Sequence, residues 1–489
     1  MADRPKNVLL LWTDQQRADT VGPDKDPRLQ MPNLERLAQS SAHFRHAYCA
    51  QPVCSPARAT VMTGVYPHTH GVVDNNIEPD PGIPMITELL RSAGYVTGYN
   101  GKWHLGNELR AQRGFDHWVS TEEGYARSHS EEGYSSYHDF LEARGYTPSD
   151  PHRDGMTFAR HTAAALPEEV GKPAFQTAEA LRFLEAHRDQ PFFFSVNYLE
   201  PHAPFNGPLN GFYKAEDMTL PDTWYGEMEA SVPLRYRRLR AAYGGDYMAG
   251  HPDWMKSNDE RGWKDLKARY WGLCTLVDKY VGRILDRLEE LGLADDTIVV
   301  YTSDHGHMMG EHGLLNKSVL YEPSAQIPFI IRVPGLPPQQ LATPVGHVDL
   351  VPTLLELLGR PLPDHLQGHS LVPLLRDGDT DPEEGQTIIE WNGSLQDDAV
   401  ATKAGPHAPL APGVVDADRT EIRTIRRGMW KLNVHASGEH ELYDLQADPA
   451  ERHNAFADAE NAGVVRELDG RLRQWQRETA DPLALPALA

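Results

Sequence analysis

Short, continuous runs of apolar residues alternate with longer segments of helical periodicity along most of the chain. The runs are too short for helices and predict strands buried on both faces, at residues 7–12, 95–99, 191–196, 297–301 and 327–333. Apolar positions three or four residues apart predict helices at residues 32–41, 85–92, 174–187, 263–291 and 349–358. This alternation predicts an α/β fold in which helices sandwich a large, mixed, mostly parallel sheet.

The pattern changes after residue 385. Short strands separated by turn residues are predicted at residues 387–391, 423–426, 429–434 and 440–443, with a helix at 462–477. We therefore expect a catalytic α/β domain, residues 1–385, and a C-terminal α+β subdomain with a small antiparallel sheet, residues 386–489. Two irregular regions, residues 118–172 and 205–260, are expected to supply substrate contacts.

Polar side chains follow the predicted strands at the point where each strand ends. They are Asp14 and Gln15, Lys102 and His104, His202, and Asp304 and His305, with Lys317 in the loop downstream. Taken singly, a strand-end aspartate is often a helix cap, and a lone histidine is more often structural. Because the carboxyl ends of parallel strands share one edge of a sheet, where ligands bind, their recurrence predicts a single site.

The stretch from Cys54 to Arg58 adds a reactive group to this picture. Pro52 and Pro56 restrict the backbone before a helix-compatible run, which places Cys54 at a loop-to-helix entry. A helix N-terminus attracts anions, and Arg58, one turn on, adds a permanent cation. The alternative is a buried free thiol beside a surface arginine.

The pattern Cys54-x-Pro56-x-Arg58, followed by the segment from Thr63 to Gly71, resembles the signature of the type I sulfatases. Residues 426–431 and 441–445 are similar to the C-terminal region of that family. The resemblance implies an alkaline phosphatase-like fold and conversion of Cys54 to formylglycine by a formylglycine-generating enzyme. One hydroxyl of the hydrated aldehyde would attack the sulfur of a small-molecule sulfate ester, and the other would later expel sulfate, which splits one hard step into two.

Asp14, Asp304 and His305 offer oxygen and imidazole ligands for one divalent cation, with Gln15 as a further oxygen ligand. The resemblance implies that the formylglycine from Cys54 also binds the metal. Many sulfatases carry paired aspartates after the first strand and an Asp-Asn pair at the later site. The pairs in this chain instead resemble the choline sulfatase and phosphonate monoester hydrolase branches. Calcium is the first choice, and the histidine leaves manganese and magnesium open.

Arg58, Lys102 and Lys317 form the cationic pocket that an anionic substrate needs, and we expect them to hold sulfate oxygens. The resemblance makes His104 the base that deprotonates the second hydroxyl of the diol. His202, with Lys317, would face the oxygen of the leaving group. The sequence leaves open which of them donates the proton.

Composition excludes some functions. The formal net charge is −23, which argues against a nucleic-acid-binding protein. Three cysteines make no disulfide framework, although a redox partnership between Cys49 and Cys54 stays open. We expect a cytoplasmic protein with no membrane association, because neither a signal peptide nor an apolar run of roughly 20 residues is visible. The oligomeric state and the identity of the sulfate ester stay open. The basic run at residues 235–240 is either a solvated helix face or a rim that attracts anions.

Two rival functions remain. One is a phosphonate or phosphate ester hydrolase that uses the same aldehyde, against which the pair Lys102 and His104 argues, since that branch lacks it. The other is an inactive binding protein in which Cys54 is never converted. A mass spectrum of the Cys54 peptide from the native host discriminates the second rival from an enzyme.

Overall fold

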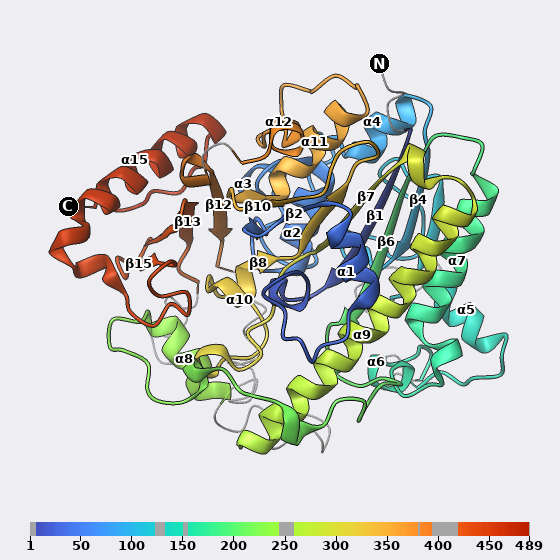
Figure 1. Ribbon diagram of the computed structural model, residues 1–489, viewed down its shortest axis with the longest axis horizontal. Helices are drawn as coiled ribbons and strands as arrows, with labels where there is room; N and C mark the ends of the chain where they lie inside the picture. The colour runs from blue at the N-terminus through green and yellow to red at the C-terminus, as the bar shows by residue number, and fades with distance from the viewer. Residues whose placement is uncertain are drawn as a thin grey trace.

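The computed structural model describes residues 6–122, 133–149, 155–243, 259–379, 382–393 and 419–488. Figure 1 shows a central sheet between two layers of helices, with a smaller sheet and a long helix at one end of the molecule. The two irregular regions fall only partly within these ranges, because residues 123–132, 150–154 and 244–258 lie outside them. No helix of the described ranges combines the length and apolar character needed to cross a membrane.

The central sheet has eight strands in the order β10-β2-β9-β7-β1-β6-β4-β5. Its middle strand, β1 (Asn7–Asp14), pairs in parallel with β6 (Phe192–Pro201) and β7 (Thr297–Ser303). The parallel run continues through β4 (Val96–Gly101) and β5 (His117–Ser120). On the other side, β9 (Phe329–Arg332) runs antiparallel to both β7 and β2 (Ala42–Phe44). The last strand on this side, β10 (Gln339–Leu341), pairs in parallel with β2, so β10 and β5 are the edge strands. The sheet is therefore mixed and mostly parallel, as predicted.

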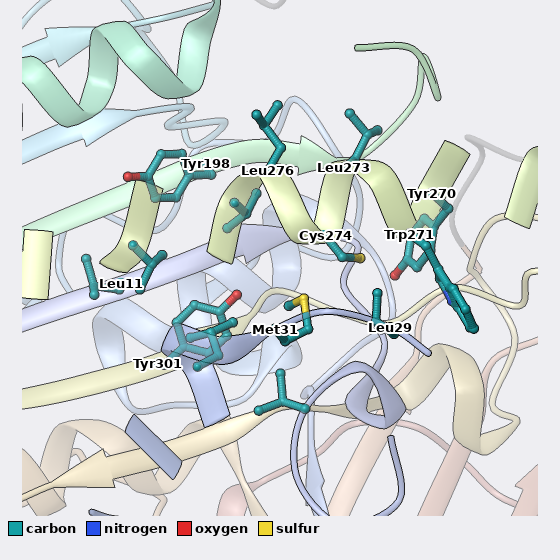
Figure 2. Close-up of a cluster of buried hydrophobic side chains, with 14 of the residues drawn as sticks. Leu11, Leu29, Met31, Tyr198, Tyr270, Trp271, Leu273, Cys274, Leu276 and Tyr301 are labelled. Carbon is teal, nitrogen blue, oxygen red and sulfur yellow. The ribbon is translucent and has the colours of Figure 1, made fainter. Parts of the chain in front are cut away.

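Alternate residues of β1 face opposite helix layers, as the period of a strand requires. Leu9 and Leu11 pack in a core with α1 (Pro32–Gln39), α7 (Lys172–Ala186) and α9 (Glu260–Glu290). Figure 2 shows Leu11 and Tyr301 of the sheet beneath Cys274 and its neighbours on α9. Val8 and Leu10 pack in the opposite core, whose helices are α2 (Cys54–Thr63), α4 (Ile86–Ser92), α11 (Leu350–Leu357) and α12 (Val372–Asp377). Burial on both faces explains why β1 is apolar from Val8 to Trp12.

The C-terminal sheet is antiparallel. Its strands are β12 (Gln386–Trp391), β13 (Ile422–Arg427), β14 (Trp430–His435) and β15 (Glu441–Asp444). Helix α15 (Ala462–Thr479) places Val465, Leu468 and Leu472 in one core with Ile425 and Leu432 of this sheet. The small antiparallel sheet was predicted, whereas the division of the chain at residue 385 stays a prediction.

The strand predicted at residues 327–333 is confirmed as β9, but its predicted start at residue 327 is wrong. The chain instead forms β8 (Gln326–Ile327), which belongs to a three-stranded sheet with β3 (Ala47–Tyr48) and β11 (Val345–Gly346), and then β9. Pro328 separates the two strands. Because proline has no N–H to donate to a ladder, an apolar run that contains one need not be one strand.

Candidate active site

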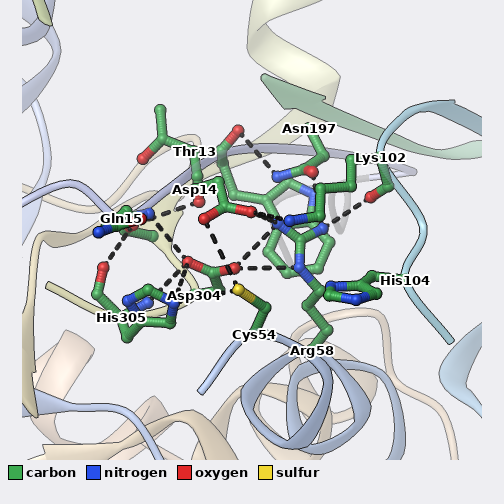
Figure 3. Close-up of polar contacts among 12 residues, drawn as sticks. Thr13, Asp14, Gln15, Cys54, Arg58, Lys102, His104, Asn197, Asp304 and His305 are labelled. Atoms are coloured by element: carbon green, nitrogen blue, oxygen red, sulfur yellow. Dashed lines mark hydrogen bonds and ion pairs between the residues drawn. The ribbon is translucent and has the colours of Figure 1, made fainter. Parts of the chain in front are cut away.

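Figure 3 shows most of the side chains predicted to form one site together at the carboxyl edge of the central sheet: Asp14, Gln15, Cys54, Arg58, Lys102, His104, Asp304 and His305. Lys317 joins them through its contacts with Cys54 and Gln15. Asp14 is the last residue of β1, and Asp304 and His305 directly follow β7. Lys102 follows β4, and His202 follows β6. Helix α2 points its N-terminus at this edge, and Cys54 is its first residue.

Cys54 is buried at the meeting point of these groups. Its Sγ atom lies 3.3 Å from His305 Nε2, 3.3 Å from Lys317 Nζ and 3.8 Å from Asp14 Oδ1. Burial and the charge of Asp14 disfavour the thiolate, yet Lys102 and Lys317 outweigh them and lower the pKa of Cys54 to about 7. The first turn of α2 therefore presents a reactive sulfur in a cationic setting, unlike an ordinary structural cysteine.

Arg58 lies fully buried beneath this sulfur, one helical turn into α2. Its Nε donates to Asp304 Oδ2 at 3.0 Å, and Nη2 lies 2.9 Å from both Asp14 Oδ2 and Asp304 Oδ2. Nη1 donates to the Lys102 carbonyl at 2.6 Å and to Asn197 Oδ1 at 2.7 Å. All three guanidinium nitrogens therefore donate hydrogen bonds, four in total, and Nη2 also forms an ion pair with Asp304. Arg58 thus neutralises and fixes the two acidic strand ends, and its predicted contact with sulfate oxygens stays a prediction.

Four side chains provide metal-ligating atoms that lie within 4.8 Å of one another: Asp14, Cys54, Asp304 and His305. His305 Nδ1 is 2.9 Å from the Gly306 carbonyl, and donation there leaves Nε2 facing the cluster, as in many metal-binding histidines. Burial would raise the pKa of Asp14, but Lys102, His202, Arg58 and Lys317 hold it well below its usual range. An ionised aspartate and an oriented imidazole suit a divalent cation.

Gln15 completes this donor set. Its φ of 73° lies in the left-handed region, and its N–H donates to Asp304 Oδ1 at 3.0 Å. Its Oε1 is 3.4 Å from Lys317 Nζ, whereas its buried Nε2 has no hydrogen-bond partner in the described part of the chain. Because the two ends of an amide are interchangeable by a flip, the same side chain can instead offer its oxygen where the nitrogen now lies. The unpartnered amide fits a site built for a cation.

The loop after β4 carries Lys102 and His104. Lys102 Nζ lies 2.6 Å from Asp14 Oδ2, and the Ser55 hydroxyl donates to the His104 carbonyl at 2.6 Å. Burial, together with the charges of Lys102 and Arg58, lowers the pKa of His104 well below its usual value. The imidazole is therefore neutral at pH 7.

Sequence reasoning missed Glu108, which fixes this loop. Its carboxylate accepts the backbone N–H groups of Trp103 and His104 at 2.9 and 2.6 Å, and burial raises its pKa to about 7. Asn197, which accepts a hydrogen bond from Arg58, was also missed. A polar residue within the apolar run of β6 was the one available signal for Asn197, and no spacing rule pointed to Glu108.

His202 and Lys317 differ in charge. The Nδ1 atom of His202 lies 2.6 Å from the Ala203 carbonyl, so its N–H donates there and Nε2 is the unprotonated nitrogen of the neutral ring. Burial, with Lys317 and Lys102 nearby, lowers the pKa of His202 well below its usual value. Burial also disfavours the charge on Lys317, but Cys54 and Asp14 raise its pKa. The cation of this pair is Lys317.

The loop that carries Lys317 is clamped on both sides. Asn316 and Ser318 have φ angles of 62° and 74°, and Ser318 donates its N–H to the Pro52 carbonyl at 3.2 Å. The Ser318 carbonyl accepts Arg235 Nη1 at 2.5 Å from α8 (Leu234–Tyr243). Arg235 is only 4% exposed, so neither a solvated face nor an anion-attracting rim describes it. The basic run therefore contributes one buried structural arginine, whereas Arg237 on the same helix is exposed, as on a solvated face.

Known proteins have the same fold and similar sequences over most of the length of this chain. A model of the sulfatase family matches residues 6–360. The choline-sulfatase of Rhizobium meliloti (strain 1021) is 28% identical over 97% of this chain and 88% of its own. The multifunctional alkaline phosphatase superfamily protein PehA of Trinickia caryophylli is 28% identical over 97% of this chain and 96% of its own. The crystal structure of a phosphonate monoester hydrolase of Agrobacterium radiobacter superposes with a TM-score of 0.75 at 25% identity, covering 97% of this chain and 96% of that one.

Proposed function

This chain belongs to the sulfatase family and is a sulfuric ester hydrolase, and we propose that it acts through a formylglycine made from Cys54 and one divalent metal ion. The observation that carries the proposal is the contact between Cys54, at the N-terminus of α2, and the cluster of Asp14, Asp304 and His305. A thiol in this place has no ordinary structural task. A formylglycine-generating enzyme is the partner that the modification requires.

The metal ion would be held by Asp14, Asp304 and His305, by the amide oxygen of Gln15 and by the converted Cys54. When bound, it supplies Lewis acidity, which lowers the pKa of the nucleophile and withdraws charge from a sulfate oxygen. Calcium is our first choice because carboxylate and amide oxygens dominate the set, with manganese and magnesium as alternatives because of the imidazole.

The hydrated aldehyde supplies one hydroxyl group to attack sulfur and a second whose deprotonation releases sulfate. Side chains of this site carry out the proton transfer and stabilise the charges of the sulfate and the leaving group. His104 is neutral and accepts the proton of the second hydroxyl. Lys102 and Lys317 place positive charge around residue 54 and hold the non-bridging oxygens of the sulfate group. On the side of the leaving group, Lys317 is charged and stabilises the departing oxygen, with His202 beside it.

Purified protein with formylglycine at position 54, verified by mass, tests the proposal on aryl sulfates, sugar sulfates and choline sulfate. The matched control is the same chain with Cys54 unmodified, which should be inactive. Release of inorganic sulfate by the converted form alone is the expected result. Inactivity on every sulfate ester, with strong turnover of phosphodiesters, would overturn it.

A phosphonate or phosphate ester hydrolase with the same nucleophile is the second candidate. Its support is the similarity to the phosphonate monoester hydrolase of Agrobacterium radiobacter, at 25% identity. Lys102 and His104 favour the sulfatase. The ratio of kcat/KM for phenyl sulfate and phenyl phosphonate monoesters decides between them.

A further inference from the structure

His202 lines a pocket that includes none of the other predicted catalytic or metal-binding residues. It lies between α6 (Arg160–Ala163), the end of β6 and the middle of α9. Much of its wall is apolar and is formed by Ala163, Ala164, Leu166, Leu199, Leu273 and Leu276. His202 lines this pocket and is the residue predicted to face the leaving oxygen, so a group bound to that oxygen would extend toward it.

The two cations of this pocket, Arg160 and Lys172, share one buried carboxylate, Glu122. Two nitrogens of Arg160, Nε and Nη2, lie 2.8 and 2.7 Å from Glu122 Oε2. Lys172 Nζ pairs with the other oxygen, Glu122 Oε1. Glu122 itself is buried. An anionic leaving group would therefore have to compete with a buried carboxylate for both cations.

Glu200, which also lines the pocket, is in the opposite situation. Its Oε2 is buried and has no hydrogen-bond partner in the described ranges of the chain. Burial raises the pKa of Glu200 to about 7, with Lys172 and Arg160 acting against that rise. Buried polar atoms normally have a partner, so this oxygen indicates a ligand that donates a hydrogen bond. A cationic donor is disfavoured, because Arg160 and Lys172 line the same pocket.

We propose that this pocket receives the leaving group of the sulfate ester and selects a compact, uncharged one, with an apolar body and a hydroxyl group that donates to Glu200. The inference rests on the proposed function and adds a substrate class to it: esters of hydroxylated aromatic or alicyclic alcohols, as opposed to choline-like cations or carboxylated leaving groups. Glu200 is then the residue that determines specificity.

The test compares 3- and 4-hydroxyphenyl sulfate with phenyl sulfate, on aldehyde-bearing protein. The better hydroxyphenyl ester should exceed phenyl sulfate in kcat/KM by about 10-fold, the usual effect of one hydrogen bond to a buried acceptor. Glu200→Leu should bring that ratio close to 1 while turnover of phenyl sulfate persists. Glu200→Gln keeps an acceptor oxygen and should retain part of the preference. Glu169→Gln, on an exposed neighbour outside the pocket, is the matched control and should keep the full ratio.

A binding measurement makes the test independent of catalysis and of variant folding. Resorcinol or hydroquinone should bind the wild-type chain about 10-fold more tightly than phenol in calorimetry, whether or not Cys54 is converted. Equal binding, a preference that survives Glu200→Leu, or faster turnover of choline sulfate or 4-carboxyphenyl sulfate than of phenyl sulfate would overturn the pocket assignment and leave the sulfatase assignment intact. Loss of all sulfate ester turnover in the converted wild type would instead remove the proposed function.

Discussion

The two sides of the active site are built on different principles. The sulfate-facing cluster, which comprises Asp14, Cys54, Arg58, Lys102, Asp304 and His305, stands on strand ends and the first turn of α2. The pocket beyond His202 is formed largely by the segment before α7, by a strand end and by the side of α9. The first side depends on regular elements of the sheet, whereas the second depends on an irregular segment.

Their polar groups differ in the same way. In the cluster, each of the three guanidinium nitrogens of Arg58 donates a hydrogen bond to a protein acceptor. In the pocket, an oxygen of Glu200 is buried without a partner. A hydrogen-bonded network holds catalytic side chains in a fixed geometry. A buried oxygen without a partner can instead accept a hydrogen bond from a substrate and so discriminate between substrates. We therefore expect changes in the cluster to abolish turnover, and changes around the pocket to alter which ester is turned over.

The largest effect should come from Cys54→Ala. Removing the nucleophile should lower kcat by about 10⁴-fold or more, because residual catalysis then depends only on binding and electrostatic stabilisation. Initial rates of sulfate release measure it. Cys49→Ala is the matched control, since Cys49 is equally buried but burial and the charge of Asp304 raise its pKa well above the usual value, which disfavours a thiolate. Turnover retained by Cys54→Ala, or lost equally in Cys49→Ala, would contradict the assignment of the nucleophile.

Asp304→Asn should have the next largest effect. The substitution keeps the shape but removes one of the two charges that Arg58 neutralises, and one ligand of the metal. We expect metal content to fall below stoichiometric and kcat/KM to fall by at least about 100-fold. Elemental analysis after dialysis measures the first quantity, and restoration with excess calcium, manganese or magnesium identifies the ion. A full complement of metal in Asp304→Asn would contradict the predicted ligand set.

The same contrast explains what the sequence could and could not predict. Asp14, Asp304 and His305 were predictable because parallel strands bring their carboxyl ends together whatever the loops do. Glu108, Asn197 and Arg235 were not, because each acts through a tertiary contact with a backbone or side-chain group that no local pattern announces. The basic run on α8 showed the limit of charge patterns. Its sequence gives no sign that Arg235 points inward over the Trp391 ring, at 4.1 Å.

Arg235→Met tests whether a side chain on α8, outside the cluster, positions a residue within it. Without the bond to the Ser318 carbonyl, the left-handed loop should relax and move Lys317 away from Cys54. Small displacements of a charged group cost about 10- to 100-fold in rate, so kcat should fall with little change in KM. Arg235→Lys should restore part of the activity. Arg237→Met, on an exposed position of the same helix, should behave as wild type, and an equal loss there would indicate damage to α8 alone.

Glu122→Gln should affect turnover least, since Glu122 touches no reacting atom. Burial opposes its ionisation, but Arg160 and Lys172 lower its pKa to about 2, below the usual 4.5. Because the folded-state pKa is depressed, the stabilisation is fully present above pH 4.5 and is lost as pH falls toward 2. Urea unfolding should show Glu122→Gln less stable by about 3 kcal/mol at pH 7, with the gap closing below pH 4.5. The uncompensated cations should also raise relative turnover of 4-carboxyphenyl sulfate several-fold. If the stability gap stayed constant down to pH 3, the ion pairs with Glu122 would not be its source.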